Sequence, residues 1–185
     1  MKKFIVFFVL VMSFITSSSL IASSPFDILL HHESPNDFKR RDRVYEFFKM
    51  FDKYIADQVK DFEKEPSDLT SKFWVKQKLT FMVEIDQYAR SQSNIPYENS
   101  YSDVEKEFFW QEYTKRLEIL DNQNTSDLKW ILKKYEWIRI SEFGKQADRN
   151  AWLIVQHADN HPKFQREIVL VLDKLWRLGE TNRIN

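Results

Sequence analysis

The 185-residue sequence contains no cysteine, only two glycines and only five prolines. Without thiols the chain forms neither a disulfide nor a thiolate metal site, so its stability must come from packing. The scarcity of glycine and proline leaves little material for turns and favours long helices. The length fits one domain that is large enough to bury a core.

Neither sign of charge predominates, because 28 Lys and Arg residues face 28 Asp and Glu residues. A chain without net charge has no broad attraction for phosphate backbones or acidic membranes, so nucleic acid is not an expected partner. Aromatic residues are abundant, at 16% of the sequence. Most tryptophans fall on apolar stripes with helical spacing, which favours core packing over a sugar-binding platform.

The N-terminus has the pattern of a secretory signal peptide, over residues 1–22. Lys2 and Lys3 precede an apolar run over residues 4–15 and a small-residue stretch over 16–24. The apolar run is shorter than the roughly 20 residues that a membrane-spanning helix needs. We therefore predict export to the bacterial periplasm or the medium. The alternative is an uncleaved N-terminal anchor, and only then is the membrane a partner.

Two regions follow the predicted signal peptide. Residues 23–37 contain two prolines and two adjacent histidines and lack periodicity, so we predict a linker there. Adjacent histidine side chains rarely point at one ion, and no metal site is expected in the linker. Residues 38–185 are predicted to form a single helical domain.

Apolar residues recur at three- and four-residue spacing along this domain, which is the pattern of amphipathic helices. The predicted helices cover residues 38–62, 68–91, 103–120, 127–135, 145–158 and 162–178. Ser102 with Glu105 predicts a capping box, and the polar residues 121–124 predict a break. Residues 136–140 are expected to be extended or irregular. The predicted fold class is all-α, an irregular bundle of five or six helices.

Two polar motifs lie on separate predicted helices. One is Asp86-Gln87-x-x-Arg90, and the other runs from Trp152 to Asp159 and is followed by Phe164-Gln165. These elements, over about residues 79–179, resemble the signature of an uncharacterised bacterial family known as domain of unknown function 6624. The resemblance implies no reaction and no cofactor.

Similar proteins continue beyond the position that matches Gly179 into another helix with an Asp-Arg pair. This chain stops at Asn185. The resemblance therefore implies a C-terminally truncated member, in which an apolar groove is expected to stay open.

The first group of candidate site residues is catalytic: His157, Asp86 and Asp159. Histidine titrates near neutral pH, and a carboxylate bonded to one ring nitrogen orients the other as a general base. His157 with Asp86 or Asp159 is therefore able to activate water or a substrate hydroxyl. Asp159 has a second interpretation, as a cap for the helix that follows it.

The second group is a set of candidate ligand-binding residues. Arg90 is able to hold a carboxylate or phosphate through two N–H groups, and it is also spaced to pair with Asp86 one turn earlier. Neutral hydrogen bonds are expected from three glutamines: Gln87, Gln156 and Gln165.

Three interpretations of these residues remain open: a buried polar network, a binding site for a small molecule or protein, and a hydrolase-like enzyme with His157 as base. Against the enzyme, no serine or cysteine lies in a recognisable nucleophile motif. No metal or other cofactor is predicted. His157, Asp159 and His161 lie within five residues, but Pro162 biases His161 away from helical geometry.

Overall fold

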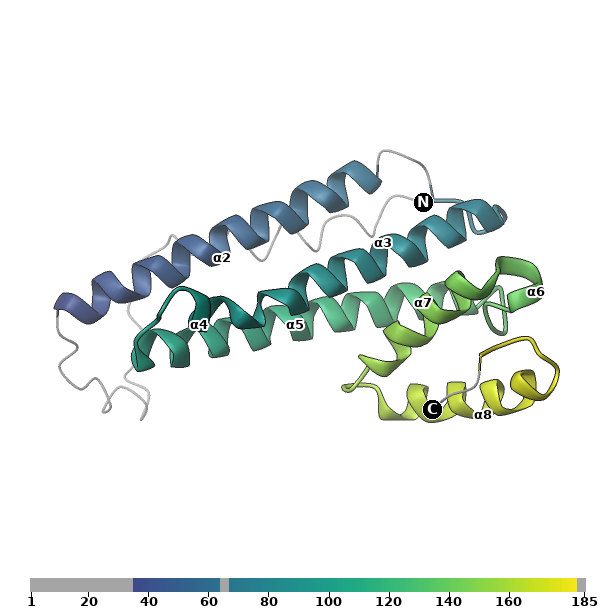
Figure 1. Ribbon diagram of the computed structural model, residues 1–185. Helices are drawn as coiled ribbons and strands as arrows, with labels where there is room; N and C mark the ends of the chain where they lie inside the picture. Colours follow the sequence, from purple (N-terminus) through teal and green to yellow (C-terminus); the bar gives the residue numbers. More distant parts are fainter. Residues whose placement is uncertain (1–34, 64–66, 183–185) are drawn as a thin grey trace, which may run out of the picture. The chain divides into compact units, whose positions relative to one another are not determined.

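The computed structural model describes residues 35–63 and 67–182 of the chain (Figure 1). The predicted signal peptide and most of the predicted linker lie outside these residues. Within them, the chain from Asp37 onward forms one unit, built from helices and connecting turns without a strand. The all-α prediction is confirmed. No helix within these ranges is long and apolar enough to cross a bilayer.

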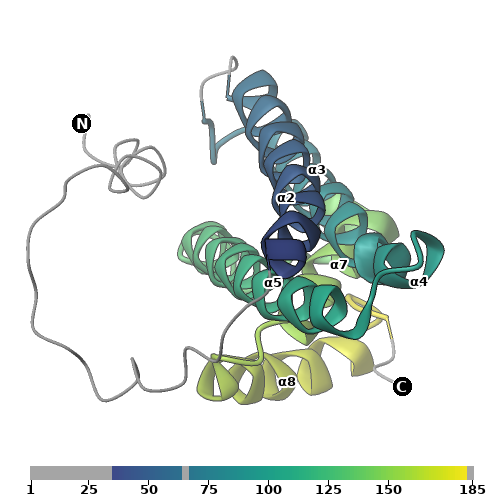
Figure 2. The same ribbon diagram turned by 90° about the vertical axis from the view of Figure 1, so that its left-hand side faces the viewer.

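The helices follow one another in the order α2 (Pro35–Phe62), α3 (Lys72–Ser91), the 3-10 turn η2 (Gln92–Asn94), α4 (Ile95–Glu98), α5 (Asp103–Leu132), α6 (Ile140–Phe143), α7 (Lys145–Gln156) and α8 (Pro162–Arg177). The three longest, α2, α3 and α5, run alongside one another (Figures 1 and 2). The shorter helices α6, α7 and α8 pack at one end of α3 and α5.

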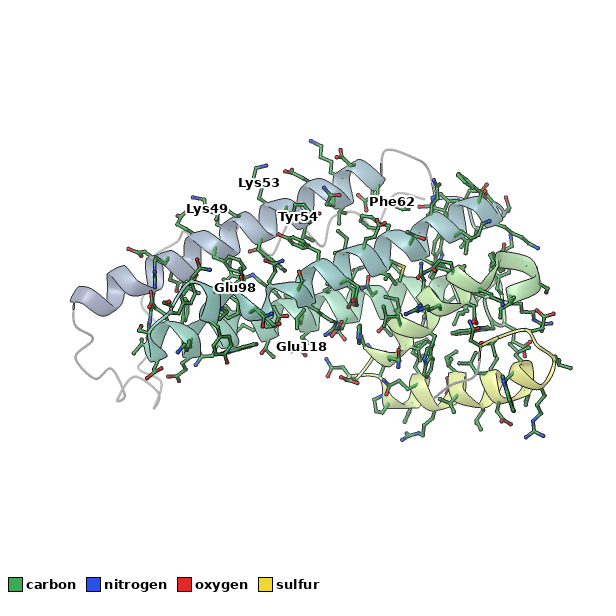
Figure 3. All side chains as sticks on the ribbon, viewed as in Figure 1. Lys49, Lys53, Tyr54, Phe62, Glu98 and Glu118 are labelled. Atoms are coloured by element: carbon green, nitrogen blue, oxygen red, sulfur yellow. The ribbon has the colours of Figure 1, made fainter. Side chains whose placement is uncertain are left out.

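An aromatic core joins α2 to α3 and to the first half of α5. Its buried members are Val44, Phe48, Phe51, Ala89, Tyr101, Phe109 and Tyr113. Figure 3 shows Tyr54 and Phe62 of α2 pointing toward α3, where their rings contact Tyr88 and Phe81. Arginine–carboxylate pairs add polar links between α2 and α5, as in the 2.8 Å contact of Arg43 with Glu105. Aromatic packing contributes more to the stability of this core than the ion pairs do, because the ion pairs are partly exposed to water.

A second core lies where α3, the last half of α5, α6, α7 and α8 meet. It is built from 18 buried residues, which include Leu79, Met82, Leu128, Ile131, Trp137, Ile138, Ile154, Ile168 and Leu172. Trp137 and Ile138 come from the segment predicted to be extended or irregular, which is the connection before α6. This core fixes α7 against α3 and α5 and thereby positions the end of α7.

Two helix starts illustrate how local chemistry sets the boundaries. The Ser102–Glu105 capping box is present at the start of α5, as predicted. The start of α3 differs from the prediction by about four residues. Ser71 caps it, with its Oγ accepting from the Trp74 amide at 3.2 Å. Asp68 instead closes a turn by accepting from the Thr70 amide at 2.7 Å.

The predicted break at residues 121–124 is wrong, because α5 runs without interruption from Asp103 to Leu132. No proline or glycine lies in this stretch to interrupt the backbone hydrogen bonds. Its polar side chains have tertiary positions instead: Asp121 bonds to Arg90, and Thr125 is buried. The separate helix predicted over 127–135 is therefore the end of α5.

Helix α7 begins after Gly144 and ends at Gln156, two residues earlier than predicted. Gly144 has φ 84° and ψ 163°, a backbone conformation open essentially to glycine alone. His157 occupies the C-cap position, with its amide bonded to Leu153 and Val155 carbonyls. The early end of α7 places the histidine ring beside α3 and α5.

Candidate functional site

The centre of the candidate site is Asp86 on α3, whose side chain is 0% exposed. Asp86 shares the buried stripe of α3 with Met82, one turn earlier, and Leu79, two turns earlier. A carboxylate in such a position must be hydrogen-bonded to remain charged. Its partners come from its own helix and from the end of α7.

The first partner is His157, whose Nδ1 lies 3.0 Å from Asp86 Oδ1. Because a carboxylate only accepts hydrogen bonds, this contact is favourable when Nδ1 carries the ring proton. The lone pair then lies on Nε2, for which the described part of the chain offers no hydrogen-bond partner. The His157 side chain is 24% exposed. Asp86 thus orients an imidazole whose other nitrogen is available.

The second partner is Arg90, one turn after Asp86. Its Nε lies 3.0 Å from Asp86 Oδ1 and 3.1 Å from His157 Nδ1, and its Nη2 donates to Asp121 Oδ1 at 2.5 Å. One guanidinium therefore links residues from α3, α5 and the end of α7. The Arg90 side chain is 28% exposed, so the cluster lies at the edge of the core.

The pKa values of the two carboxylates in the cluster shift in opposite directions. Burial acts to raise the pKa of Asp86, but His157, Arg90 and Gln87 outweigh burial and hold that pKa below its ordinary value. Burial raises the pKa of Asp121 above its ordinary value, against the opposing effect of Arg90. Burial also opposes the charge of Arg90, yet Asp86 and Asp121 raise the pKa of Arg90. Asp86 and Arg90 are therefore the firmly ionised pair.

The structure brings together four of the seven residues predicted from the sequence: Asp86, Gln87, Arg90 and His157. Gln87 donates to Asp86 Oδ2 at 2.9 Å and completes the hydrogen bonding of the carboxylate. Gln165 instead donates to the Val155 carbonyl at 3.0 Å and to the Gln156 carbonyl at 3.3 Å, so it ties α8 to the end of α7.

The other two predicted residues, Gln156 and Asp159, have exposed side chains. Helix α8 has His161 at its N-cap position, so Asp159 lies too early in the chain to cap it. His161 contacts α5, with Nε2 3.2 Å from Asn122 Oδ1 and Nδ1 3.3 Å from Lys129 Nζ. The side chains of His157, Asp159 and His161 therefore do not meet at one site.

Asp121 is the cluster member that the sequence analysis missed, since it was assigned to a helix-ending turn. The sequence pattern that indicates its position is helical spacing. Asp121 follows Leu117 by one turn and precedes the buried Leu128 by two turns, so it lies on the inward face if the helix is continuous. Asp121, Asp86 and His157 have potential metal-ligand atoms within 4.8 Å of one another. Within residues 35–63 and 67–182, these three residues form a group able to hold a cation.

A second buried polar cluster surrounds Asp148 of α7, which is 1% exposed. One carboxylate oxygen accepts from Trp137 Nε1 and Thr181 Oγ1, both at 2.7 Å. The other accepts from the backbone and side-chain nitrogens of Asn182, at 3.0 and 2.7 Å. Asp148 therefore anchors the segment after α8 to α7 and to the connection before α6.

The fold and the site define an all-helical protein in which a carboxylate, a guanidinium and an imidazole link three helices. This chain belongs to the family of unknown function DUF6624, whose family model matches residues 74–183. The matched region contains the whole Asp86 cluster and the Asp148 cluster, and it confirms the resemblance seen in the sequence. No curated protein and no solved structure matches the chain.

Proposed function

We propose that this chain is an exported small-ligand-binding module and that its ligand contacts His157. The observation that carries the proposal is the orientation of the imidazole: Nδ1 lies 3.0 Å from the buried Asp86 carboxylate, while a quarter of the side chain is exposed. Export rests on the signal-peptide pattern of residues 1–22.

A buried structural histidine usually has both ring nitrogens bonded within the protein, whereas a partly exposed one leaves a nitrogen open to water or to a ligand. In the described ranges, His157 Nε2 has no such partner, and its lone pair suits a ligand that donates an N–H or O–H. Asp86 and Arg90 act as positioning residues, because their closest contacts are to each other, to His157 and to Asp121. Polar groups at the rim of an apolar core are typical of small-molecule sites.

The binding proposal is tested with His157→Gln, in which the amide is able to keep a hydrogen bond to Asp86. Ligand-observed NMR would measure a panel of small alcohols, amines, carboxylates and phosphate monoesters against the purified chain. We expect at least one class to bind wild type and to lose binding about ten-fold or more in the variant, with the melting temperature preserved.

His161→Gln is the matched control, because His161 is a half-buried histidine held by α5 rather than by Asp86. We expect this variant to bind the same compounds as wild type. Equal binding by His157→Gln and wild type, or no binding of any class, would contradict the proposal.

A hydrolase-like enzyme is the second candidate, and the Asp86–His157 contact favours it. A positioned general base typically contributes about 10² to 10⁴ in rate. If His157 has this role, we expect wild type to hydrolyse p-nitrophenyl acetate or p-nitrophenyl phosphate and His157→Ala to be at least about 100-fold slower. Hydrolysis that is absent in wild type, or that is equal in the two proteins, counts against the enzyme.

A further inference from the structure

The cluster around Asp86 has the composition and the spacing of a cation site. Asp86, Asp121 and His157 each supply one ligand atom, and these atoms lie within 4.8 Å of one another. Two of them, Asp86 Oδ1 and His157 Nδ1, are 3.0 Å apart. Neighbouring ligands at about 2.1 Å from a metal ion are also about 3 Å apart.

A positive group already lies at this point, because the Arg90 guanidinium contacts all three residues. Two carboxylates around one guanidinium leave an excess of one negative charge when both are ionised. A divalent cation would balance both charges. The Arg90 side chain is 28% exposed, and its long stem allows the guanidinium to turn into water when a cation replaces it.

The hydrogen bonds around His157 Nδ1 also favour a cation. This nitrogen lies 3.0 Å from an acceptor, Asp86 Oδ1, and 3.1 Å from a donor, Arg90 Nε. A protonated Nδ1 faces the Arg90 N–H, and an unprotonated Nδ1 faces the carboxylate, so either tautomer leaves one unfavourable contact. A metal ion in the place of the guanidinium would remove the conflict, because Nδ1 and Oδ1 would both act as lone-pair donors to it.

Thr125 provides an independent observation. It lies one turn after Asp121 on the same face of α5 and is 1% exposed, and its Oγ1 has no hydrogen-bond partner in the structure. Buried hydroxyl groups without a protein partner commonly contact a bound water or ion. We therefore take this unsatisfied hydroxyl, one helical turn from Asp121, as a candidate partner for a water bound at the ion.

From these observations we propose that a divalent transition-metal cation binds to Asp86, Asp121 and His157 in the place of the Arg90 guanidinium. The inference goes beyond the proposed function, because it uses the same histidine through its other ring nitrogen: a metal ion would take the lone pair of Nδ1, and Nε2 would then carry the ring proton. One imidazole nitrogen with two carboxylate oxygens suits Mn²⁺, Fe²⁺ or Zn²⁺ better than Ca²⁺ or Mg²⁺, which prefer oxygen ligands alone.

The test is titration of the purified full chain, freed of metal with EDTA and dialysed, with MnCl₂ and ZnCl₂. Calorimetry would follow both metals, and electron paramagnetic resonance would follow free Mn²⁺. We expect one saturable site per chain. Asp121→Asn and His157→Ala should each weaken binding at least about ten-fold, and Arg90→Ala should strengthen it because no guanidinium has to be displaced.

Asp127→Asn is the matched control, because Asp127 lies on the same helix and pairs with Lys78 outside the cluster. It should bind metal as wild type does, and melting curves of each variant verify folding. Absence of a saturable site in wild type, or equal affinity in His157→Ala, would overturn the cation site.

The two proposals fail separately when the small-molecule panel is measured with EDTA present. His157-dependent binding of the panel without any metal binding would refute only the cation. Metal binding without any His157-dependent binding of the panel would support the cation and refute the small-molecule ligand.

Discussion

Replacing Asp148 by alanine is expected to lower the free energy of unfolding by about 3 to 5 kcal/mol. The buried carboxylate accepts hydrogen bonds from Trp137, Thr181 and Asn182, and no basic side chain within the described ranges pairs with it. Alanine would leave the Trp137 N–H buried without an acceptor and would release the segment that follows α8. Urea denaturation of the variant and wild type measures the difference.

Asp173→Ala is the control for this experiment, because Asp173 is exposed on α8 and pairs with the exposed Arg177. A surface pair of this kind contributes less than about 1 kcal/mol. Asp148→Asn should fall between the two, since the amide keeps one oxygen acceptor. A loss below about 1 kcal/mol in Asp148→Ala would show that Asp148 does not anchor the C-terminal segment.

The helices could be predicted where their apolar spacing and their caps agree. Ser102 and Glu105 are three residues apart, and the structure contains the capping box that this spacing predicts. Residues 121–124 show the limit of such reasoning. Local propensity favours a turn there, but packing of α5 against α3 and α7 keeps the helix continuous.

The site could be predicted in part, because two of its helices carry recognisable polar residues on apolar stripes. Asp86 and Arg90 are one turn apart, and His157 ends an apolar segment, so a shared location was a reasonable inference. Asp121 could not be assigned in this way, because its inward position follows only if the helix continues through residues 121–124, where local propensity favours a turn. Asp148 was missed for another reason: its partners lie outside helix α7, in the connection before α6 and in the segment after α8.

Removing the carboxylate of Asp86 should lower the free energy of unfolding by about 3 to 5 kcal/mol at neutral pH, because it leaves a partly buried guanidinium and an imidazole without their shared acceptor. Asp86→Ala makes the change. Asp121→Asn is the matched variant. It should cost much less, since burial already opposes the charge of Asp121 and raises its pKa.

The loss in Asp86→Ala should also depend on pH in a defined direction. The pKa of Asp86 is lower in the folded chain than its ordinary value of 3.8, so its ionisation stabilises the fold. This contribution is complete above the unfolded pKa and is lost as the pH falls through the folded pKa. The contribution of Asp121 to stability changes with pH in the opposite direction, because its pKa is raised in the folded chain. It is present below the unfolded pKa and is lost as the pH rises through the folded pKa.

Urea denaturation at about pH 7 and about pH 3 separates these effects. Wild type should lose stability toward pH 3, because the unfolded chain takes up a proton at Asp86 more readily than the folded chain does. Asp86→Ala should lose less over the same range, so that the difference between the two proteins narrows. Asp121→Asn should show a steeper acid loss than wild type, because it lacks the opposing contribution. A constant difference between wild type and Asp86→Ala across the range would mean that the pKa of Asp86 is the same in the folded and the unfolded chain, so that its contacts do not favour the ionised form.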